Sequence, residues 1–221
     1  APHHLRAQIL YYIAENLEAR QDEFTRRLTA LTGDSKAAKA EIDLSLQRLF
    51  TYGAWCDKYD GQVHTPPSRT IAVAMKEAIG NVGVICPDTN PLLGFVSLVA
   101  PLIAMGNRVI ALPSETAPLA VTDLYQVFDT SDLPGGVVNI VTGRRADMAP
   151  TMAGHNDIDA LWCFAPDAEL SKQVEELSIS NLKQTWCNYG KHYDWSADYA
   201  EGEEFLRRAT QVKNIWVPYG E

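Results

Sequence analysis

VGVICPDTNPLLGFVSLVAPLIAMGNRVIAL, residues 82–112, is the stretch that decides the fold. It opens on a short β-rich run, Val82 to Cys86, and closes on another, Val109 to Leu112. The apolar stretch between them, Pro91 to Met105, is shorter than the roughly 20 residues of a membrane crossing, and Gly94 and Pro101 interrupt it. The stretch therefore predicts a strand, a buried helix and a second strand.

The same alternation continues toward the C-terminus. Further strands are expected at Val137 to Val141, Ala160 to Phe164 and Leu182 to Cys187, with helices at Ala117 to Phe128 and Ala168 to Leu177. Alternating strands and helices are typical of a parallel sheet covered by helices on both faces. The predicted fold class is α/β, with a Rossmann-like doubly wound parallel sheet.

The flanking segments have different patterns. Apolar residues at helical spacing predict a helix that ends at Gly33, and Asp34 or Ser35 can cap a second helix that runs to about Lys58. After Pro66 and Pro67, residues 70–75 alternate like a strand; a short helix near 201–208 and a last strand over 211–217 follow the sheet. The expected organisation is a helical hairpin (1–61), an extended flap segment (62–81), a Rossmann-like domain (82–191), a linker with a short helix (192–210) and a C-terminal flap strand (211–221).

Composition excludes some partners. The 221 residues include 19 Lys and Arg against 28 Asp and Glu, and a net charge of −9 argues against nucleic-acid and anionic-membrane surfaces. The four cysteines are widely separated and form no CxxC pair, which predicts reduced thiols and a cytoplasmic protein. His3 and His4 have no acidic or cysteine companions at ligand spacing, so no metal site is expected.

The loops after the predicted strands carry few chemical signals. None shows the GxGxxG spacing that lets backbone amides approach a pyrophosphate. Cys187 near His192 is the one candidate thiol nucleophile, although its aromatic neighbours fit packing as well. The acidic groups 157–159 and 201–204 fit solvated turns and helix starts better than paired catalytic acids and bases.

Several motifs resemble the cofactor-domain signatures of aldehyde dehydrogenases. They are VGVICP (82–87), APLIAMGN (100–107), PSE (113–115) and GVVNIVTG (136–143), and SNLK (180–183) and QVKNIWV (211–217) are similar to later strands of that family. The resemblance covers nearly the whole chain. The motifs WCDKYDG (55–61) and WVPYGE (216–221) most resemble the non-catalytic C-terminal domain of family-16 aldehyde dehydrogenases.

The resemblance also implies that catalytic residues of the family are replaced. Thr89 stands where the family has the asparagine that stabilises the oxyanion, and Asn188 stands where it has the general-base glutamate. Only nineteen residues separate Lys191 from Gln211, where the family has the domain that bears the nucleophilic cysteine. No catalytic residue is therefore expected in this chain.

The cofactor residues are replaced as well. Leu112 stands in place of the lysine that binds the adenosine ribose, Arg145 in place of the second glycine of a GxG turn, and Phe164-Ala165-Pro166 in place of the turn beside the phosphates. Ser114 and Glu115 are the only remnants of the adenosine site. No cofactor is expected on this chain, and NAD is expected only at the catalytic module of a parent aldehyde dehydrogenase.

The leading hypothesis is a non-catalytic domain of a larger aldehyde dehydrogenase, a homo-oligomer, in which Ala1 marks the edge of a fragment. In the family the flap strands pair with a neighbouring subunit, so the flap is expected to bind the catalytic module of the same or a partner chain. The expected interface residues are Val212, Lys213, Ile215, Trp216 and Val217, whose apolar side chains lie on both faces of the strand and predict burial of both. The alternatives are a degenerate dinucleotide or metabolite sensor that uses Ser114 and Glu115, and a thiol enzyme built on Cys187.

Overall fold

The computed structural model describes residues 2–219 and contains a parallel sheet of five strands at its centre. The strand order is β5-β4-β3-β6-β7, and every neighbouring pair is parallel. The strands are β3 (Asn81–Ile85), β4 (Arg108–Leu112), β5 (Val138–Ile140), β6 (Ala160–Cys163) and β7 (Gln184–Cys187). This sheet confirms the predicted α/β class with a Rossmann-like core.

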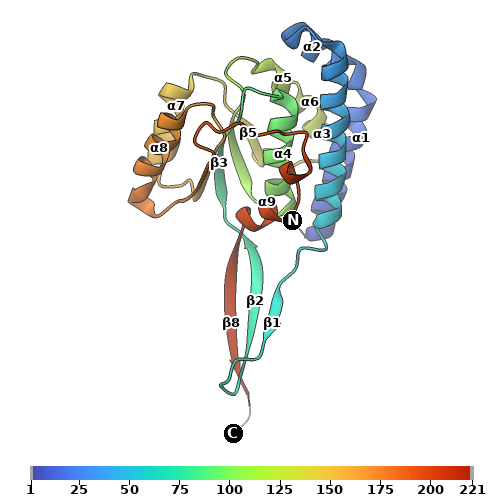
Figure 1. The fold of residues 1–221 in the computed structure, drawn as a ribbon. Coiled ribbons are helices and arrows are strands. Elements are labelled where there is room, and N and C mark those ends of the chain that lie inside the picture. Colours follow the sequence, from blue (N-terminus) through green and yellow to red (C-terminus); the bar gives the residue numbers. More distant parts are fainter. Residues whose placement is uncertain (1, 220–221) are drawn as a thin grey trace.

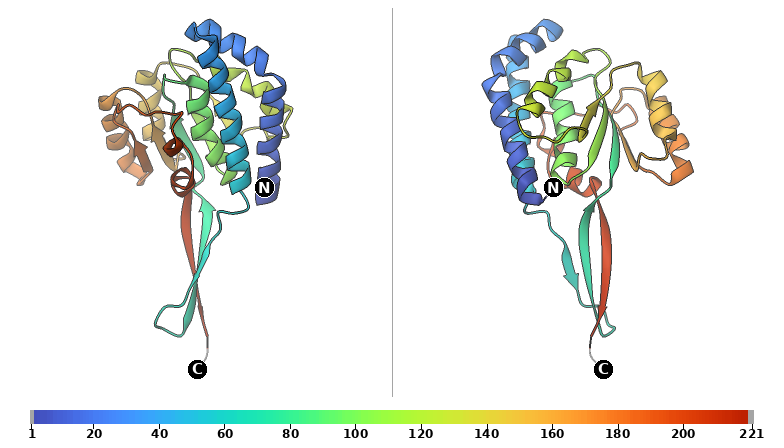
Figure 2. Two further views of the ribbon diagram at one scale, coloured as in Figure 1. Left: turned by 45° about the vertical axis from the view of Figure 1, so that its right-hand side comes forward. Right: turned by 180° about the vertical axis from the view of Figure 1, so that it is seen from behind.

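Helices cover both faces of the sheet (Figures 1 and 2). The apolar helix α4 (Pro91–Ala104) lies on one face with α5 (Leu119–Thr122) and α6 (Leu124–Asp129), while α7 (Arg145–Gly154) and α8 (Ala168–Leu177) lie on the other. A large core fills the α4 side, and a smaller core, which includes Ile85, Leu161 and Cys163, lies under α7 and α8. Within residues 2–219, no helix combines the length and apolar composition that a membrane crossing needs.

The N-terminal region has three helices where a hairpin of two was predicted. They are α1 (His3–Ala19), α2 (Gln21–Thr32) and α3 (Ser35–Trp55), and all three pack beyond α4. The first predicted helix breaks at Arg20, whose guanidinium binds Glu23 and Gln126 of α6. The apolar spacing stays in phase across the break, so the sequence pattern does not reveal it. The predicted stop at Gly33 and the Asp34 cap are confirmed, since Asp34 accepts the amides of Lys36 and Ala37.

Three other elements differ from the sequence prediction. The helix expected over 117–128 is two short helices that meet at Asp123, and α7 was not predicted because Pro150 lies inside it. The strand expected from Leu182 begins at Gln184, since Leu182 has a positive φ of 54° at the end of the 3-10 helix η1 (Ser178–Asn181). Beyond β7 come η2 (Asp198–Ala200) and α9 (Glu203–Arg208).

A second, antiparallel sheet projects from the core as a narrow arm (Figure 1). Its strands are β1 (Gln62–His64), β2 (Thr70–Ala78) and β8 (Thr210–Pro218), and we call them the flap. β2 lies in the middle and pairs with β8 over its full length, from Thr70 opposite Pro218 to Ala78 opposite Thr210. The first partner of each long flap strand is therefore in the same chain, and pairing of the flap with another subunit stays a prediction.

One buried asparagine explains why the two long strands leave the core together. The amide of Asn107 donates to the carbonyls of Leu102 and Ala209, and its oxygen accepts the backbone N–H of Gly80. Gly80 follows β2 and Ala209 precedes β8, so one side chain joins the two roots of the flap to the end of α4. Because both roots are fixed side by side, antiparallel pairing within the chain follows directly.

We expect Asn107→Ala to lower the free energy of unfolding by about 2 kcal/mol, because the Gly80 N–H and the Ala209 carbonyl lose this partner, whereas the Leu102 carbonyl keeps the backbone N–H of Asn107. The substitution should also speed amide hydrogen exchange in β2 and β8 before it affects β3. Chemical denaturation and hydrogen exchange by mass spectrometry measure both effects. Asn16→Ala is the matched control, since Asn16 bonds to Thr130 and Ser131 near the surface. Equal losses in the two variants would contradict this role of Asn107.

Candidate functional site

The carboxyl ends of the parallel strands form the edge where an α/β sheet binds its ligands. In this chain that edge holds a buried guanidinium. The side chain of Arg145, at the start of α7, is only 8% exposed and reaches back between the loops that follow β3 and β4. It donates to the carbonyl of Cys86 and forms a two-point ion pair with Asp88, with N–O distances of 2.6 and 2.7 Å.

Asp88 is the acceptor at the centre of this cluster. Besides the guanidinium, its Oδ1 accepts the Ser114 hydroxyl at 2.8 Å and the backbone N–H groups of Glu115 and Thr116. Burial alone would raise the pKa of Asp88, but the hydrogen bonds from Arg145 and Ser114 outweigh it and lower the pKa to about 2. Asp88 is therefore an anion at neutral pH and compensates the buried charge of Arg145.

The two residues that the resemblance assigns to an adenosine site, Ser114 and Glu115, belong to the same cluster. The Ser114 hydroxyl is buried and used by Asp88, while the Glu115 carboxylate accepts the backbone N–H of Arg145 at 3.0 Å. Leu112, at the position where the resemblance expects a lysine, packs into the smaller core. The structure thus brings Ser114, Glu115 and Arg145 together, but their polar groups are directed toward one another.

The N-terminus of α4 is closed to anions from outside as well. Glu41 of α3 is buried, and its Oε1 accepts the N–H groups of Leu92 and Leu93 in the first turn of α4. Burial raises the pKa of Glu41, although these two amide donors act in the opposite direction. A carboxylate of the protein therefore occupies the position where the helix dipole would favour a bound anion.

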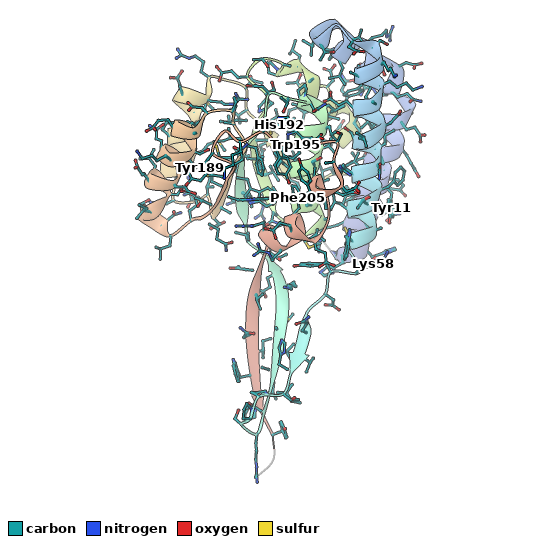
Figure 3. The ribbon with its side chains drawn as sticks, viewed as in Figure 1. Tyr11, Lys58, Tyr189, His192, Trp195 and Phe205 are labelled. Carbon is teal, nitrogen blue, oxygen red and sulfur yellow. The ribbon has the colours of Figure 1, made fainter. Side chains whose placement is uncertain are left out.

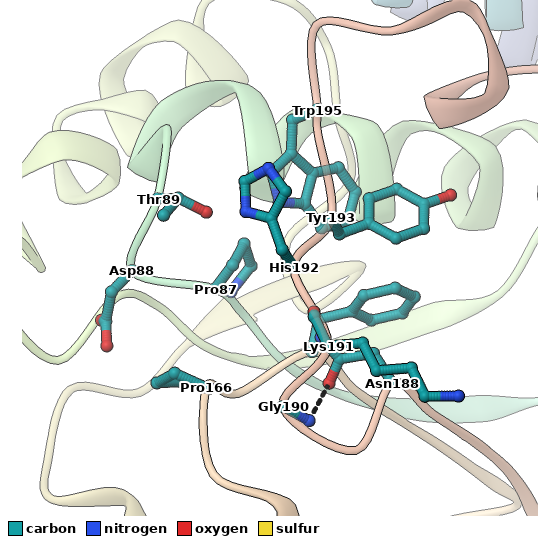
Figure 4. A pocket seen from close by; sticks show the side chains of 11 residues that line it. Pro87, Asp88, Thr89, Pro166, Asn188, Gly190, Lys191, His192, Tyr193 and Trp195 are labelled. Atoms are coloured by element: carbon teal, nitrogen blue, oxygen red, sulfur yellow. Dashed lines mark hydrogen bonds between the residues drawn. The ribbon is translucent and has the colours of Figure 1, made fainter.

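A pocket of about 220 Å³ lies beside this cluster, at the point in the strand order where β3 and β6 are neighbours (Figure 4). The loops after β3, β6 and β7 line it, and Thr89, His192 and Trp195 face it in Figure 4. Its wall is aromatic, because Phe164, Tyr193 and Trp195 contact one another with ring centroids 4.6 to 5.4 Å apart. Trp195 is fully buried, and its indole N–H has no hydrogen-bond partner among residues 2–219.

Asn188 lines the same pocket, but its amide closes a local turn. Its oxygen accepts the N–H of Gly190, and its nitrogen donates to the carbonyl of Lys191 (Figure 4). An amide side chain engaged in this way cannot take up a proton as a general base. Cys187 points elsewhere: its side chain packs against the smaller core with Cys163, while His192 lines the pocket. The structure does not bring the candidate thiol and its candidate base together.

The remaining sequence candidates have structural roles. Asp159 accepts the N–H of Asn81 at the start of β3, Glu201 pairs with the buried Arg48 at 2.6 Å, and Glu204 binds Arg207 and Arg208. His4 lies 3.7 Å from Asp57 at the surface. Among residues 2–219, no three His, Cys, Asp or Glu side chains are grouped as a metal site would require.

The expected interface residues lie on the flap. Every residue of β8 from Gln211 to Pro218 is exposed, so this chain does not supply the burial that the sequence predicted for both faces. The register places Val217 and Ile215 opposite Ile71 and Val73 on one face, and Trp216 opposite Ala72 on the other. Val63 of β1 lies opposite Val73 and extends the first, aliphatic face.

Sequence reasoning missed two residues that define this site, Asp88 and Glu41. The one available signal for Asp88 was Arg145 itself, since a buried guanidinium requires a carboxylate nearby. No local signal distinguishes Glu41, because it follows Ala38 and Ala40 on a helix and its partners Leu92 and Leu93 lie about fifty residues away.

We expect Asp88→Asn to destabilise the chain by about 3 kcal/mol at pH 7, because a buried guanidinium loses its counter-ion. The pKa of Asp88 is lower in the folded chain, so its stabilising effect is full above its unfolded value near 4 and is lost as the pH falls toward 2. The difference between parent and variant should thus fall to about half at pH 3. Urea denaturation at both pH values measures it.

Asp147→Asn is the matched control for this series. Asp147 lies two residues beyond Arg145 and pairs with Arg144 at 3.5 Å, but both side chains of this pair are largely exposed. A surface pair of this kind contributes little. A loss of stability in Asp88→Asn that does not change with pH would contradict the role of Asp88 as the counter-ion of Arg145. An equal, pH-dependent loss in Asp147→Asn would contradict it as well.

Comparison with known proteins gives these observations a context. The model of the aldehyde dehydrogenase family matches residues 1–192. The chain is 31% identical over 188 residues to the NADP/NAD-dependent aldehyde dehydrogenase PuuC of Escherichia coli, a match that covers 84% of this chain and 38% of that enzyme. It is 27% identical to human cytosolic 10-formyltetrahydrofolate dehydrogenase over 84% of this chain and 21% of that protein.

Solved structures show the same fold. A Staphylococcus aureus betaine aldehyde dehydrogenase variant in complex with NAD+ superposes with a TM-score of 0.80 at 23% identity, over 85% of this chain and 38% of that chain. PnpE from Pseudomonas sp. WBC-3 superposes with a TM-score of 0.79 at 24% identity, over 84% and 38%. The chain spans about 38% of the length of PuuC and of both solved structures. Sequence and fold together show that this chain belongs to the aldehyde dehydrogenase family.

Proposed function

We propose that this chain is a non-catalytic, cytoplasmic domain of a larger aldehyde dehydrogenase and that it acts in oligomerisation, assembly or active-site closure through its flap. Its partner in this proposal is the catalytic module of the same or another chain, and NAD binds only there. The observation that carries the proposal is the flap itself: nine paired residues of β2 and β8 project from the core and leave an apolar face uncovered.

The closed ligand edge supports the proposal that this chain is non-catalytic. Arg145, Asp88, Ser114 and Glu115 bind one another where the resemblance places a cofactor, and opening the cluster would leave a guanidinium without its anion. Asn188 supplies an amide where a general base is needed. Only a turn, η2 and α9 connect Lys191 with β8.

The flap supports the proposed role in association with another chain or domain. Its aliphatic face contains the exposed side chains of Val63, Met75, Ile215 and Val217, while Trp216 is 59% exposed on the other face. β8 is an edge strand, and β1 covers only three positions of β2 on the other side. Exposed apolar surface next to unpaired backbone N–H and C=O groups is typical of a sheet that another chain or domain completes.

We expect Ile215→Asp and Trp216→Asp to weaken association with the catalytic module by at least about tenfold, because a charge would be buried in an apolar contact. The two substitutions lie on opposite faces of β8. The one that weakens association more therefore shows which face the catalytic module covers. Light scattering and sedimentation of the purified chain, alone and mixed with the catalytic module, measure the association.

Leu119→Asp is the control for these flap variants. Leu119 is an exposed apolar residue at the start of α5, at the end of the molecule opposite the flap (Figure 1). It introduces the same charge without touching the flap. Unchanged association in both flap variants would defeat the proposed role, whereas an equal loss in the control would assign the effect to charge alone.

A second candidate function is a degenerate dinucleotide or metabolite sensor. The pocket beside Asp88 favours it, because Phe164, Tyr193 and Trp195 give the pocket an aromatic wall of the kind that small-molecule sites have. Ser114 and Glu115 count against a dinucleotide, since both are held within the Asp88 cluster.

Calorimetric titration of the chain with NAD and with NADH separates the two functions. Because the polar groups of the former adenosine site are internally satisfied, we expect no heat of binding from either ligand even at about millimolar concentration. Binding at about micromolar concentration would favour the sensor and would make Glu115→Gln the next variant.

A further inference from the structure

Two of the four cysteines lie side by side in the sheet. Cys163 ends β6 and Cys187 ends β7, and the two are directly paired in the parallel register. The preceding residues of the two strands, Trp162 and Trp186, form an edge-to-face contact on the other face of the sheet, with ring centroids 5.0 Å apart. This aromatic pair fixes the register, so the two thiols face each other on the side of α8.

We propose that Cys163 and Cys187 form a redox-active thiol pair, which a peroxide converts into an intramolecular disulfide. The distance between neighbouring strands is about 4.8 Å, and disulfides join Cα atoms that are about 4.4 to 6.8 Å apart. The strand spacing therefore falls within the range of Cα separations that a disulfide joins. The proposal is independent of the flap and of the aldehyde dehydrogenase chemistry of the family.

The surroundings of the pair distinguish it from ordinary buried cysteines. Cys163 is buried and lies 3.7 Å from the Ser171 hydroxyl of α8, whereas Cys187 is only half-buried and gives the pair access to the surface. Tyr189, two residues beyond Cys187, lies beside α8 and donates its hydroxyl to Glu175 of that helix (Figure 3). The exit from the pair is thus a polar surface and not the apolar core.

The two thiols share one easily lost proton. A hydrogen bond with Cys187 lowers the pKa of Cys163 to about 7, although burial acts in the opposite direction. The same interaction, burial and the nearby Glu175 carboxylate raise the pKa of Cys187, so the pair holds its second proton firmly. By contrast, burial raises the pKa of both Cys56 and Cys86 to about 12. Among the four cysteines, Cys163 is therefore the one whose thiol ionises near neutral pH.

The reaction balances with one peroxide. Transfer of the remaining proton from Cys187 to Cys163 places the thiolate on the more exposed sulfur, and the Cys187 thiolate then attacks a peroxide oxygen. The O–O bond breaks, hydroxide leaves and is protonated to water, and Cys187 becomes a sulfenic acid. Cys163 then attacks the Cys187 sulfur, the S–O bond breaks and a second water leaves. Two thiols are oxidised to one disulfide while hydrogen peroxide is reduced to two waters.

The test is oxidation of the full chain with hydrogen peroxide near neutral pH, followed by alkylation of free thiols under denaturing conditions and peptide mass spectrometry. We expect one linked peptide that contains Cys163 and Cys187, and at least about tenfold slower modification of Cys56 and Cys86. Absence of the linked peptide, or oxidation of all four cysteines at one rate, would overturn the proposal.

Single variants assign the steps. Cys163→Ala should accumulate a sulfenic acid on Cys187 that dimedone traps, whereas Cys187→Ala should protect the buried Cys163. Cys86→Ala is the matched control and should form the disulfide as the parent does. Thermal unfolding confirms that each variant is folded before its dimedone labelling and disulfide formation are measured. Equal dimedone labelling in both pair variants would contradict the order of the two steps.

A second measurement needs no oxidant. Phenylarsine oxide binds two adjacent thiols with loss of water, so the reduced chain should take up one equivalent, and either pair variant should take up none. Uptake of less than one equivalent by the folded parent would show that the two sulfurs cannot act together and would overturn the proposal. Uptake without any disulfide after peroxide treatment would also overturn it, because the pair would then lack redox activity.

Discussion

The ion pair between Arg145 and Asp88 is the interaction on which the ligand edge of this chain depends. A guanidinium that is almost fully buried loses its hydration, and only a carboxylate with good geometry can compensate it. Asp88 does so with both oxygens and also collects the Ser114 hydroxyl and two loop amides. The loops after β3 and β4 and the start of α7 are thereby held together without a ligand.

The closed edge contrasts with the opposite end of the molecule. There, Asn107 fixes the roots of β2 and β8 to the core, and the paired strands extend away from it with exposed apolar side chains on both faces. Polar groups that are satisfied internally offer little binding energy to a cofactor, whereas exposed apolar surface and open strand edges offer much to another polypeptide. The fold is that of the family, and the exposed apolar surface of the flap lies away from the closed ligand edge.

Much of the fold could be predicted from the sequence because its signals are local. The β-rich run from Val82, the apolar helix from Pro91 and the Asp34 cap each depend on neighbouring residues, and the structure confirms all three. Elements decided by distant contacts were missed. Arg20, at the break, contacts Gln126 far along the chain, and the start of α7 is held by the ion pair between Arg145 and Asp88.

The candidate site divides in the same way. By itself the sequence determined which residue types are present: an arginine for a glycine, an asparagine for a glutamate, cysteines at the ends of two strands and an apolar last strand. Only the tertiary structure decided what they contact. It joined Arg145 to Asp88 across fifty-seven positions, directed Ser114 and Glu115 inward, paired β8 with β2 of its own chain and set Cys163 opposite Cys187. The physical reason is that the chemical identity of a side chain is local, whereas burial, pairing and charge compensation depend on residues that only the folded sheet brings together.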